Sequence, residues 1–175
     1  MRRISNYCYQ LVNARVMWAS SVVFVLFLVF VLPNMAGTLP VSPDSSFIYS
    51  ASDIYDMAES YGPEGRAYYI RTRYTFDVVW PIVYLAFLAA GLSALFRSSG
   101  SLVNLLPFGA VALDFLENIA ASVVMHRFPD PAPIAAHVAP VFTFFKWILV
   151  ALSFAALFVG IVLAAKARIL DGSDS

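Results

Sequence analysis

The chain has 175 residues, of which 61% are hydrophobic and only 13% charged, and its formal net charge is zero. A soluble domain has about a quarter of its residues charged, so this composition favours a single domain embedded in a lipid bilayer. No basic run is present, and a nucleic acid is not expected as a partner. The single cysteine, Cys8, leaves no pair for an internal disulfide or a dithiol redox motif.

Four apolar stretches are each long enough to cross the hydrocarbon core as a helix, which takes about 20 residues. They extend over 16–35, 76–96, 102–125 and 135–165. The first follows Arg2 and Arg3 as a signal sequence would, but the residues around Asn34–Ala36 form a poor cleavage site, so we expect a retained anchor. The predicted fold is all-α: one transmembrane domain over 1–175, arranged as an up-down-up-down four-helix bundle.

The distribution of basic residues predicts the orientation. One side of the predicted bundle carries Arg2, Arg3, Arg15, Arg97, Lys166 and Arg168, and the other carries Arg66, Arg71, Arg73 and Arg127. The positive-inside rule assigns the more basic side to the cytoplasm. Both termini are therefore expected in the cytoplasm of a multi-pass protein of the cell membrane, with the loop 36–75 outside.

The outer loop divides into two parts. Its first part is rich in Pro, Ser and Gly and is expected to be irregular. Its second part has helix start and stop signals, namely Ser52 or Asp53 as N-cap, Gly62 as stop and Pro63 as the first residue of a further helix. These signals predict a short helix over 53–61, followed by a helix that runs into the second apolar stretch.

Four ionisable side chains lie inside the apolar stretches: Asp77, Asp114, Glu117 and Lys146. Such a residue costs about 2.5 to 3.5 kcal/mol at mid-membrane, which makes it a functional-site hypothesis by default. Because the connections between the last three stretches are short, depth can be estimated by counting residues from each turn. Asp114 and Lys146 lie equally far from the outer turn near Asp130, so we predict that they pair.

Further polar residues belong to the same level. Asn118 lies four residues after Asp114 and shares its helix face, and Thr143 is level with that face by the same count. Asp77 precedes Pro81 by four residues, so its carbonyl oxygen loses its helical N–H partner and can accept from a neighbouring donor. The sequence thus predicts a polar centre in the outer leaflet.

The charges of this predicted centre do not balance. Its three carboxylates face one lysine. Compensation requires Arg71 or Arg73 to reach in, a carboxyl to stay protonated, or a cation to bind. The surplus of acid therefore indicates proton or cation handling.

Several short motifs occur together between about residues 61 and 160. They are Gly62-Pro63-Glu64-Gly65-Arg66 before Tyr69, Asp77-x-x-Trp80-Pro81-x-x-Tyr84, Asp114-x-x-Glu117-Asn118 and Thr143-x-x-Lys146-Trp147. In this combination the chain resembles a group of bacterial four-span integral membrane proteins that has no assigned function. The resemblance implies the same topology and names no substrate or cofactor.

Three functions stay open at this point. The first is binding of a proton, cation, small polar ligand or lipid headgroup by a set of eight residues: Asp77, Trp80, Tyr84, Asp114, Glu117, Asn118, Thr143 and Lys146. The second is a membrane enzyme acting on a lipid or isoprenoid, with Glu117 or Asp114 as general acid or base beside Lys146. The third is a non-catalytic assembly subunit, in which the polar residues only fix helix register.

The expected partners are the lipid bilayer and a lipid or small polar ligand, and a homo-oligomer stays an open alternative. No metal is expected, because His126 and His137 lack the close spacing and the third ligand of a zinc site. No cofactor is indicated by any motif.

Overall fold

The computed structural model describes residues 1–35, 43, 46–97 and 102–173, and the regular structure in these ranges is helical. In chain order the elements are α1 (Arg2–Leu11), α2 (Ala14–Leu26), the π-helical turn η1 (Phe27–Val31), α3 (Leu32–Met35), α4 (Ala51–Arg73), α5 (Phe76–Phe96), the 3₁₀ turn η4 (Val103–Leu105), α6 (Leu106–Arg127) and α7 (Pro133–Ser173). The all-α prediction is confirmed for these residues.

Four helical stretches within the described chain are long and apolar enough to cross a membrane. They are Ala14–Asn34, Ala51–Phe96, Val103–Arg127 and Pro133–Leu170. Each contains most or all of one predicted apolar stretch. The ends differ by a few residues, except that α4 continues into α5 across a short break and that α7 extends well past position 165.

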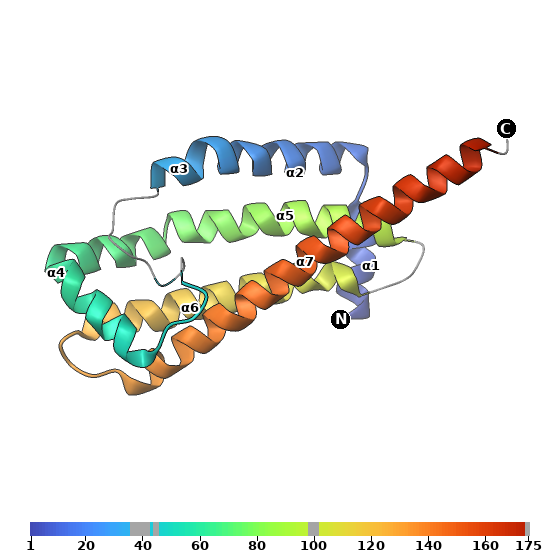
Figure 1. The fold of residues 1–175 in the computed structure, drawn as a ribbon. Coiled ribbons are helices and arrows are strands. Elements are labelled where there is room, and N and C mark those ends of the chain that lie inside the picture. The colour runs from blue at the N-terminus through green and yellow to red at the C-terminus, as the bar shows by residue number, and fades with distance from the viewer. Residues whose placement is uncertain (36–42, 44–45, 98–101, 174–175) are drawn as a thin grey trace.

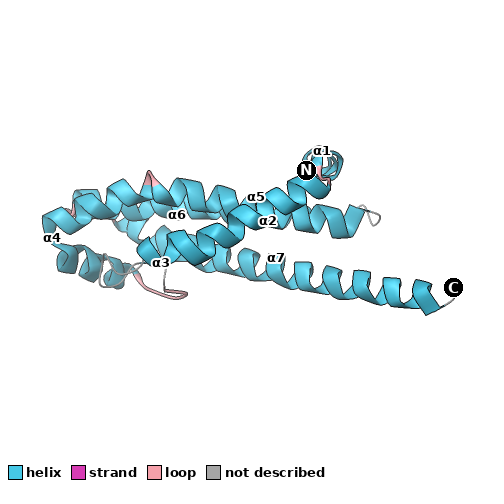
Figure 2. Cartoon of the chain, turned by 90° about the horizontal axis from the view of Figure 1, so that it is seen from above, coloured by secondary structure: helices cyan, strands magenta, loops and turns pink. Residues whose placement is uncertain are grey.

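The long helices lie side by side. Helices α5, α6 and α7 form the body, with α2 along α5 (Figure 1). Helix α4 covers one end of α6 and α7, and the last turns of α7 extend beyond the other helices at the opposite end (Figures 1 and 2). Near α4, four helices (α4, α5, α6 and α7) therefore supply side chains to one level.

Helix α1 was not predicted, and it lies across the end of the bundle opposite α4 (Figure 2). A buried amide holds it there. The Ser5 hydroxyl donates to Asn104 Oδ1 at 2.7 Å, and Asn104 Nδ2 donates to the Ser5 carbonyl at 3.2 Å and to Ser93 Oγ at 3.0 Å. One side chain of η4 thus fastens α1 to α5.

Helix α4 begins two residues earlier than the sequence indicated. Its N-cap is Ser50 rather than Ser52 or Asp53: the Asp53 N–H donates to Ser50 Oγ at 3.3 Å, and the Ser50 N–H donates to Asp53 Oδ2 at 2.7 Å. This is a capping box, in which two helix-end donors are satisfied reciprocally. The irregular segment expected before it lies almost wholly outside the described residues.

The break predicted within the outer region is present. Gly62 has φ 62° and ψ 177°, a conformation essentially restricted to glycine, and Pro63 starts the following helical segment. The bend reverses the chain, so that the part before Gly62 packs over α6 and α7 while the part after it leads into α5 (Figure 1).

Helices α5 and α7 approach closely where they cross. A methyl group at Gly160 would lie 2.9 Å from Phe96 and 3.0 Å from Leu95, and one at Gly91 would lie 2.7 Å from Leu157. Small residues at helix crossings let backbones come together.

Two apolar clusters fill the interior on either side of the polar residues. The cluster beneath α4 contains Ile54, Tyr69, Ala121, Val124 and Ala136. The cluster between α2, α5 and α6 contains Phe24, Tyr84, Leu88, Ala110 and Val111. On α6 the buried members of the first cluster come after residue 119, and those of the second come before residue 112. Asp114, Glu117 and Asn118 fall in the gap between them.

Gly62→Ala tests the bend at the α4 break. The added methyl group would meet no atom within 4 Å, so the expected cost is purely that of the backbone conformation. We expect the free energy of unfolding to fall by about 1 to 3 kcal/mol. Gly65→Ala, in the helical segment after the break, is the control and should be neutral or slightly stabilising. Equal stability of wild type and Gly62→Ala in detergent unfolding would contradict this description of the bend.

Candidate functional site

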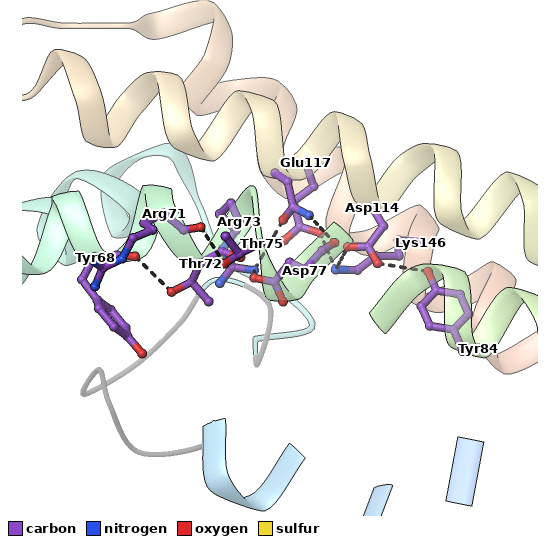
Figure 3. Close-up of polar contacts among 11 residues, drawn as sticks. Tyr68, Arg71, Thr72, Arg73, Thr75, Asp77, Tyr84, Asp114, Glu117 and Lys146 are labelled. Atoms are coloured by element: carbon purple, nitrogen blue, oxygen red, sulfur yellow. Dashed lines mark hydrogen bonds and ion pairs between the residues drawn. The ribbon is translucent and has the colours of Figure 1, made fainter. Parts of the chain in front are cut away.

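The ammonium group of Lys146 lies between two carboxylates of α6. Its Nζ is 2.5 Å from Glu117 Oε2 and 3.3 Å from Asp114 Oδ1 (Figure 3). The side chains of Lys146 and Glu117 are 6% and 0% exposed. The predicted pairing of Asp114 with Lys146 is thus present, and Glu117 makes the shorter contact. This group of three charges joins α6 to α7.

A second ion pair joins the end of α4 to the start of α5. Arg73 Nη1 lies 2.9 Å from Asp77 Oδ2 and donates to Asn118 Oδ1 at 3.4 Å. Asn118 Nδ2 in turn donates to the Asp77 carbonyl oxygen at 3.5 Å. That carbonyl is the one deprived of its helical partner by Pro81, so the predicted neighbouring donor is Asn118.

The sequence left open whether Arg71 or Arg73 reaches into the polar centre, and in the structure it is Arg73. It reaches into the polar centre and also lies over the Tyr69 ring, 4.3 Å from the centroid, whereas Arg71 is exposed and lies over Tyr68. The centre therefore contains the carboxylates of Asp77, Asp114 and Glu117 and the cations Arg73 and Lys146. With every group ionised, its formal charge is −1 rather than −2.

Two tyrosines extend the network. The Tyr84 hydroxyl donates to Asp114 Oδ2 at 3.0 Å, so each Asp114 oxygen has a partner. Tyr49 was not predicted, and no sequence pattern marks it; its hydroxyl lies 3.1 Å from Thr143 Oγ1, which donates to the Ala139 carbonyl. Burial raises the pKa of Tyr49, so its hydroxyl stays protonated. The hydrogen bonds of Thr143 are thus to Tyr49 and to the Ala139 carbonyl, and they do not involve the ion pairs.

A cavity of about 110 Å³ lies against one side of the polar centre. Its wall is formed by Asp77, Trp80 and Tyr84 of α5, Asp114 of α6, and Lys146, Trp147, Val150 and Phe154 of α7. Five of the eight predicted site residues therefore border it. Glu117, Asn118 and Thr143 do not, and they act on the cavity only through their neighbours.

The cavity is polar at one end and apolar at the other. Val150 and Phe154 follow Lys146 by four and eight residues, so they continue its face of α7 away from the charges. This spacing is the signal that identifies both residues from sequence once Lys146 is chosen. Phe154 is 38% exposed, so the apolar end reaches the outer surface of α7.

Aromatic rings enclose much of the cavity. Trp80 packs edge-on against Tyr84 with centroids 5.8 Å apart, and Phe24 of α2 stacks on Trp80 at 5.7 Å. Phe47 lies against Trp147 at 5.0 Å. Aromatic side chains therefore line the cavity beside the carboxylates of its polar end.

Comparisons of the chain with models of protein families, with curated proteins and with solved structures found no match. The resemblance to bacterial four-span membrane proteins stays an expectation from the motifs.

Lys146→Met tests the ion pairs. The change leaves Glu117 fully buried without a cation, and breaking a buried pair in this way costs about 3 to 5 kcal/mol. We expect a matching loss in the free energy of unfolding, measured in detergent, and partial recovery in Lys146→Met/Glu117→Gln, which removes the unpaired charge. Lys166→Met, an exposed lysine on the same helix, is the control and should unfold like wild type. A Lys146→Met protein as stable as wild type would rule out the pairing.

Proposed function

We propose that the protein crosses the cell membrane four times in an up-down-up-down arrangement, with both termini in the cytoplasm. We further propose that its polar centre binds a small polar group of a ligand that enters the cavity between α5 and α7. Four long apolar helices and the count of basic residues support the topology. The cavity beside the ion pairs supports the binding role.

One observation carries the proposal: charged side chains border an open volume. A cluster that only fixes helix register would be packed on all sides, because empty space next to a buried charge forfeits both solvation and packing. Here Asp77, Asp114 and Lys146 line about 110 Å³ of space. A polar ligand in that space would solvate the charges that the protein has removed from water.

The residual charge indicates what the site can accept. A formal charge of −1 in a weakly polar surrounding is unfavourable, and a proton, a cation or a ligand rich in hydrogen-bond donors would relieve it. Asp114 holds its hydrogen bonds from Tyr84 and Lys146, so its position is fixed before a ligand arrives. The site is in this sense preorganised.

A structural role is the second candidate, and the number of helices joined favours it. Arg73–Asp77 joins α4 to α5, Asn118 joins α5 to α6, and Lys146 joins α6 to α7. Polar contacts of this kind hold helices together in membranes. The two roles are separated by a variant that fills the cavity and leaves every ion pair in place.

Val150→Trp is that variant. Its indole would occupy the apolar part of the cavity, so we expect the purified protein to lose lipid or other small molecules that wild type retains, with its thermal unfolding midpoint nearly unchanged. The bound molecules are measured by mass spectrometry of intact protein released from detergent. Val159→Trp is the matched control, since Val159 is 50% exposed on α7 and lies outside the cavity. Wild-type protein that carries no bound molecule under any mild purification would contradict the binding role.

The topology has its own test by cysteine labelling. In a Cys8→Ser background, Glu59→Cys on α4 should react with a membrane-impermeant maleimide in intact cells, whereas Arg97→Cys at the end of α5 should react only after the membrane is opened. Both parent side chains are exposed, so burial does not limit the reaction. The reverse labelling pattern would invert the proposed orientation.

A further inference from the structure

The height of the polar centre follows from the spacing of charges along two helices. Asp77 precedes Arg97 by 20 residues, and Lys146 precedes Lys166 by 20 residues. At about 1.5 Å per residue this is about 30 Å, the thickness of the hydrocarbon core. Lys166 lies further inward than Arg97, because Gly160 already packs against Leu95 and Phe96. With both basic residues towards the inner boundary of the hydrocarbon, Asp77 and Lys146 lie in its outer part, close to the lipid headgroups.

The charged and apolar ends of the cavity follow the same order as the headgroup and acyl chains of a lipid at that height. Its charged end is at Asp77 and Lys146, and its apolar end at Phe154 lies eight residues further along α7, about 12 Å towards the middle of the membrane. Because Phe154 is partly exposed on the surface of α7, the apolar end is continuous with the surface that faces the acyl chains. An amphiphile can enter sideways, with its headgroup uppermost.

The side chains around the polar end favour a cationic headgroup. Asp77 and Asp114 are 15% and 10% exposed, against 6% for Lys146, so carboxylate is the more accessible charge. The Lys146 ammonium group is drawn towards Glu117, which lies outside the cavity wall. The centre has a formal charge of −1, which an ammonium group placed beside the carboxylates would offset locally.

The aromatic lining points to the same kind of group. Trp80, Tyr84 and Trp147 border the space beside the two aspartates. Faces of Trp and Tyr attract ammonium groups, by about 0.5 to 2 kcal/mol each, and they combine with carboxylates in sites for organic cations.

The volume limits the size of the group that is enclosed. A cavity of about 150 Å³ accommodates benzene, and this one is about 110 Å³. An aminoethyl group, with two carbons and one nitrogen, fits inside. A sugar headgroup does not, and the rest of the lipid would lie in the opening and along the surface of α7.

We infer that the cavity binds the ammonium group of an outer-leaflet phospholipid, of the phosphatidylethanolamine class, between Asp77 and Asp114. This inference rests on the proposed function, since it names the ligand of the same cavity. The ammonium group donates hydrogen bonds to the carboxylates and lies against the ring of Trp80. The first part of one acyl chain lies along Val150 and Phe154.

The test is a lipid titration followed by mass spectrometry of the intact protein in detergent. Phosphatidylethanolamine and phosphatidylglycerol with identical acyl chains are the two probes. We expect the first to bind about tenfold more tightly, because charge-assisted hydrogen bonds to the ammonium group have no counterpart in the glycerol headgroup. Asp114→Asn, which leaves Lys146 paired with Glu117, should remove this preference, and Glu59→Gln on the outer face of α4 should keep it.

A second variant avoids any change of charge. Trp80→Leu should weaken binding of phosphatidylethanolamine several-fold while leaving that of phosphatidylglycerol unchanged. The matched control is Trp18→Leu on α2, where the tryptophan is 71% exposed and lies outside the cavity, and it should alter neither.

The outcomes separate this inference from the proposed function. Equal binding of both lipids, or a preference for phosphatidylglycerol, overturns the ammonium assignment, while the binding role stands if Val150→Trp still releases the lipid. Binding of free ethanolamine as tight as that of the lipid overturns the assignment to a membrane lipid. No binding of any probe by wild type, together with no effect of Val150→Trp, overturns both.

Discussion

The contact of Lys146 with Asp114 and Glu117 is the interaction on which the rest of the structure depends. It connects α6 and α7 at the level where α4 meets α5, and its members are almost wholly withdrawn from solvent. An ammonium group held between two carboxylates is tolerable in such a place only because each carboxylate offsets part of its desolvation. The helices that carry these three residues therefore have little freedom to shift in register.

Around this contact, polar and apolar side chains occupy separate layers of the bundle. One apolar cluster lies beneath α4 and another lies between α2, α5 and α6, and the ion pairs occupy the layer between them. The same layer contains the break caused by Pro81, where Asn118 supplies the missing donor to the Asp77 carbonyl. Stability and the proposed binding role thus use the same residues. Trp80, Tyr84 and Trp147 line the cavity on one side of this layer.

Much of this arrangement could be predicted from sequence, because the signals were local or periodic. Apolar length gave the four long helices, equal distance from a turn gave the Asp114–Lys146 pair, and a proline gave the free carbonyl of Asp77. What sequence could not supply depends on tertiary contact. The choice of Arg73 over Arg71 depends on how α4 meets α5, and Tyr49 reaches Thr143 from a segment without regular structure. Helix α1 is short and polar, and it is fastened by Asn104 from a distant part of the chain.

The most direct test of the central claim, that Asp77 and Asp114 contact a bound polar group, is solid-state NMR on perdeuterated protein in D₂O with protonated lipids. The only abundant protons are then those of the lipid. The account predicts magnetisation transfer from headgroup protons to the carboxyl carbon of Asp114, despite its burial, and loss of this transfer in Val150→Trp. Transfer confined to residues on the outer surface of the helices, with none to Asp77 or Asp114, would contradict it.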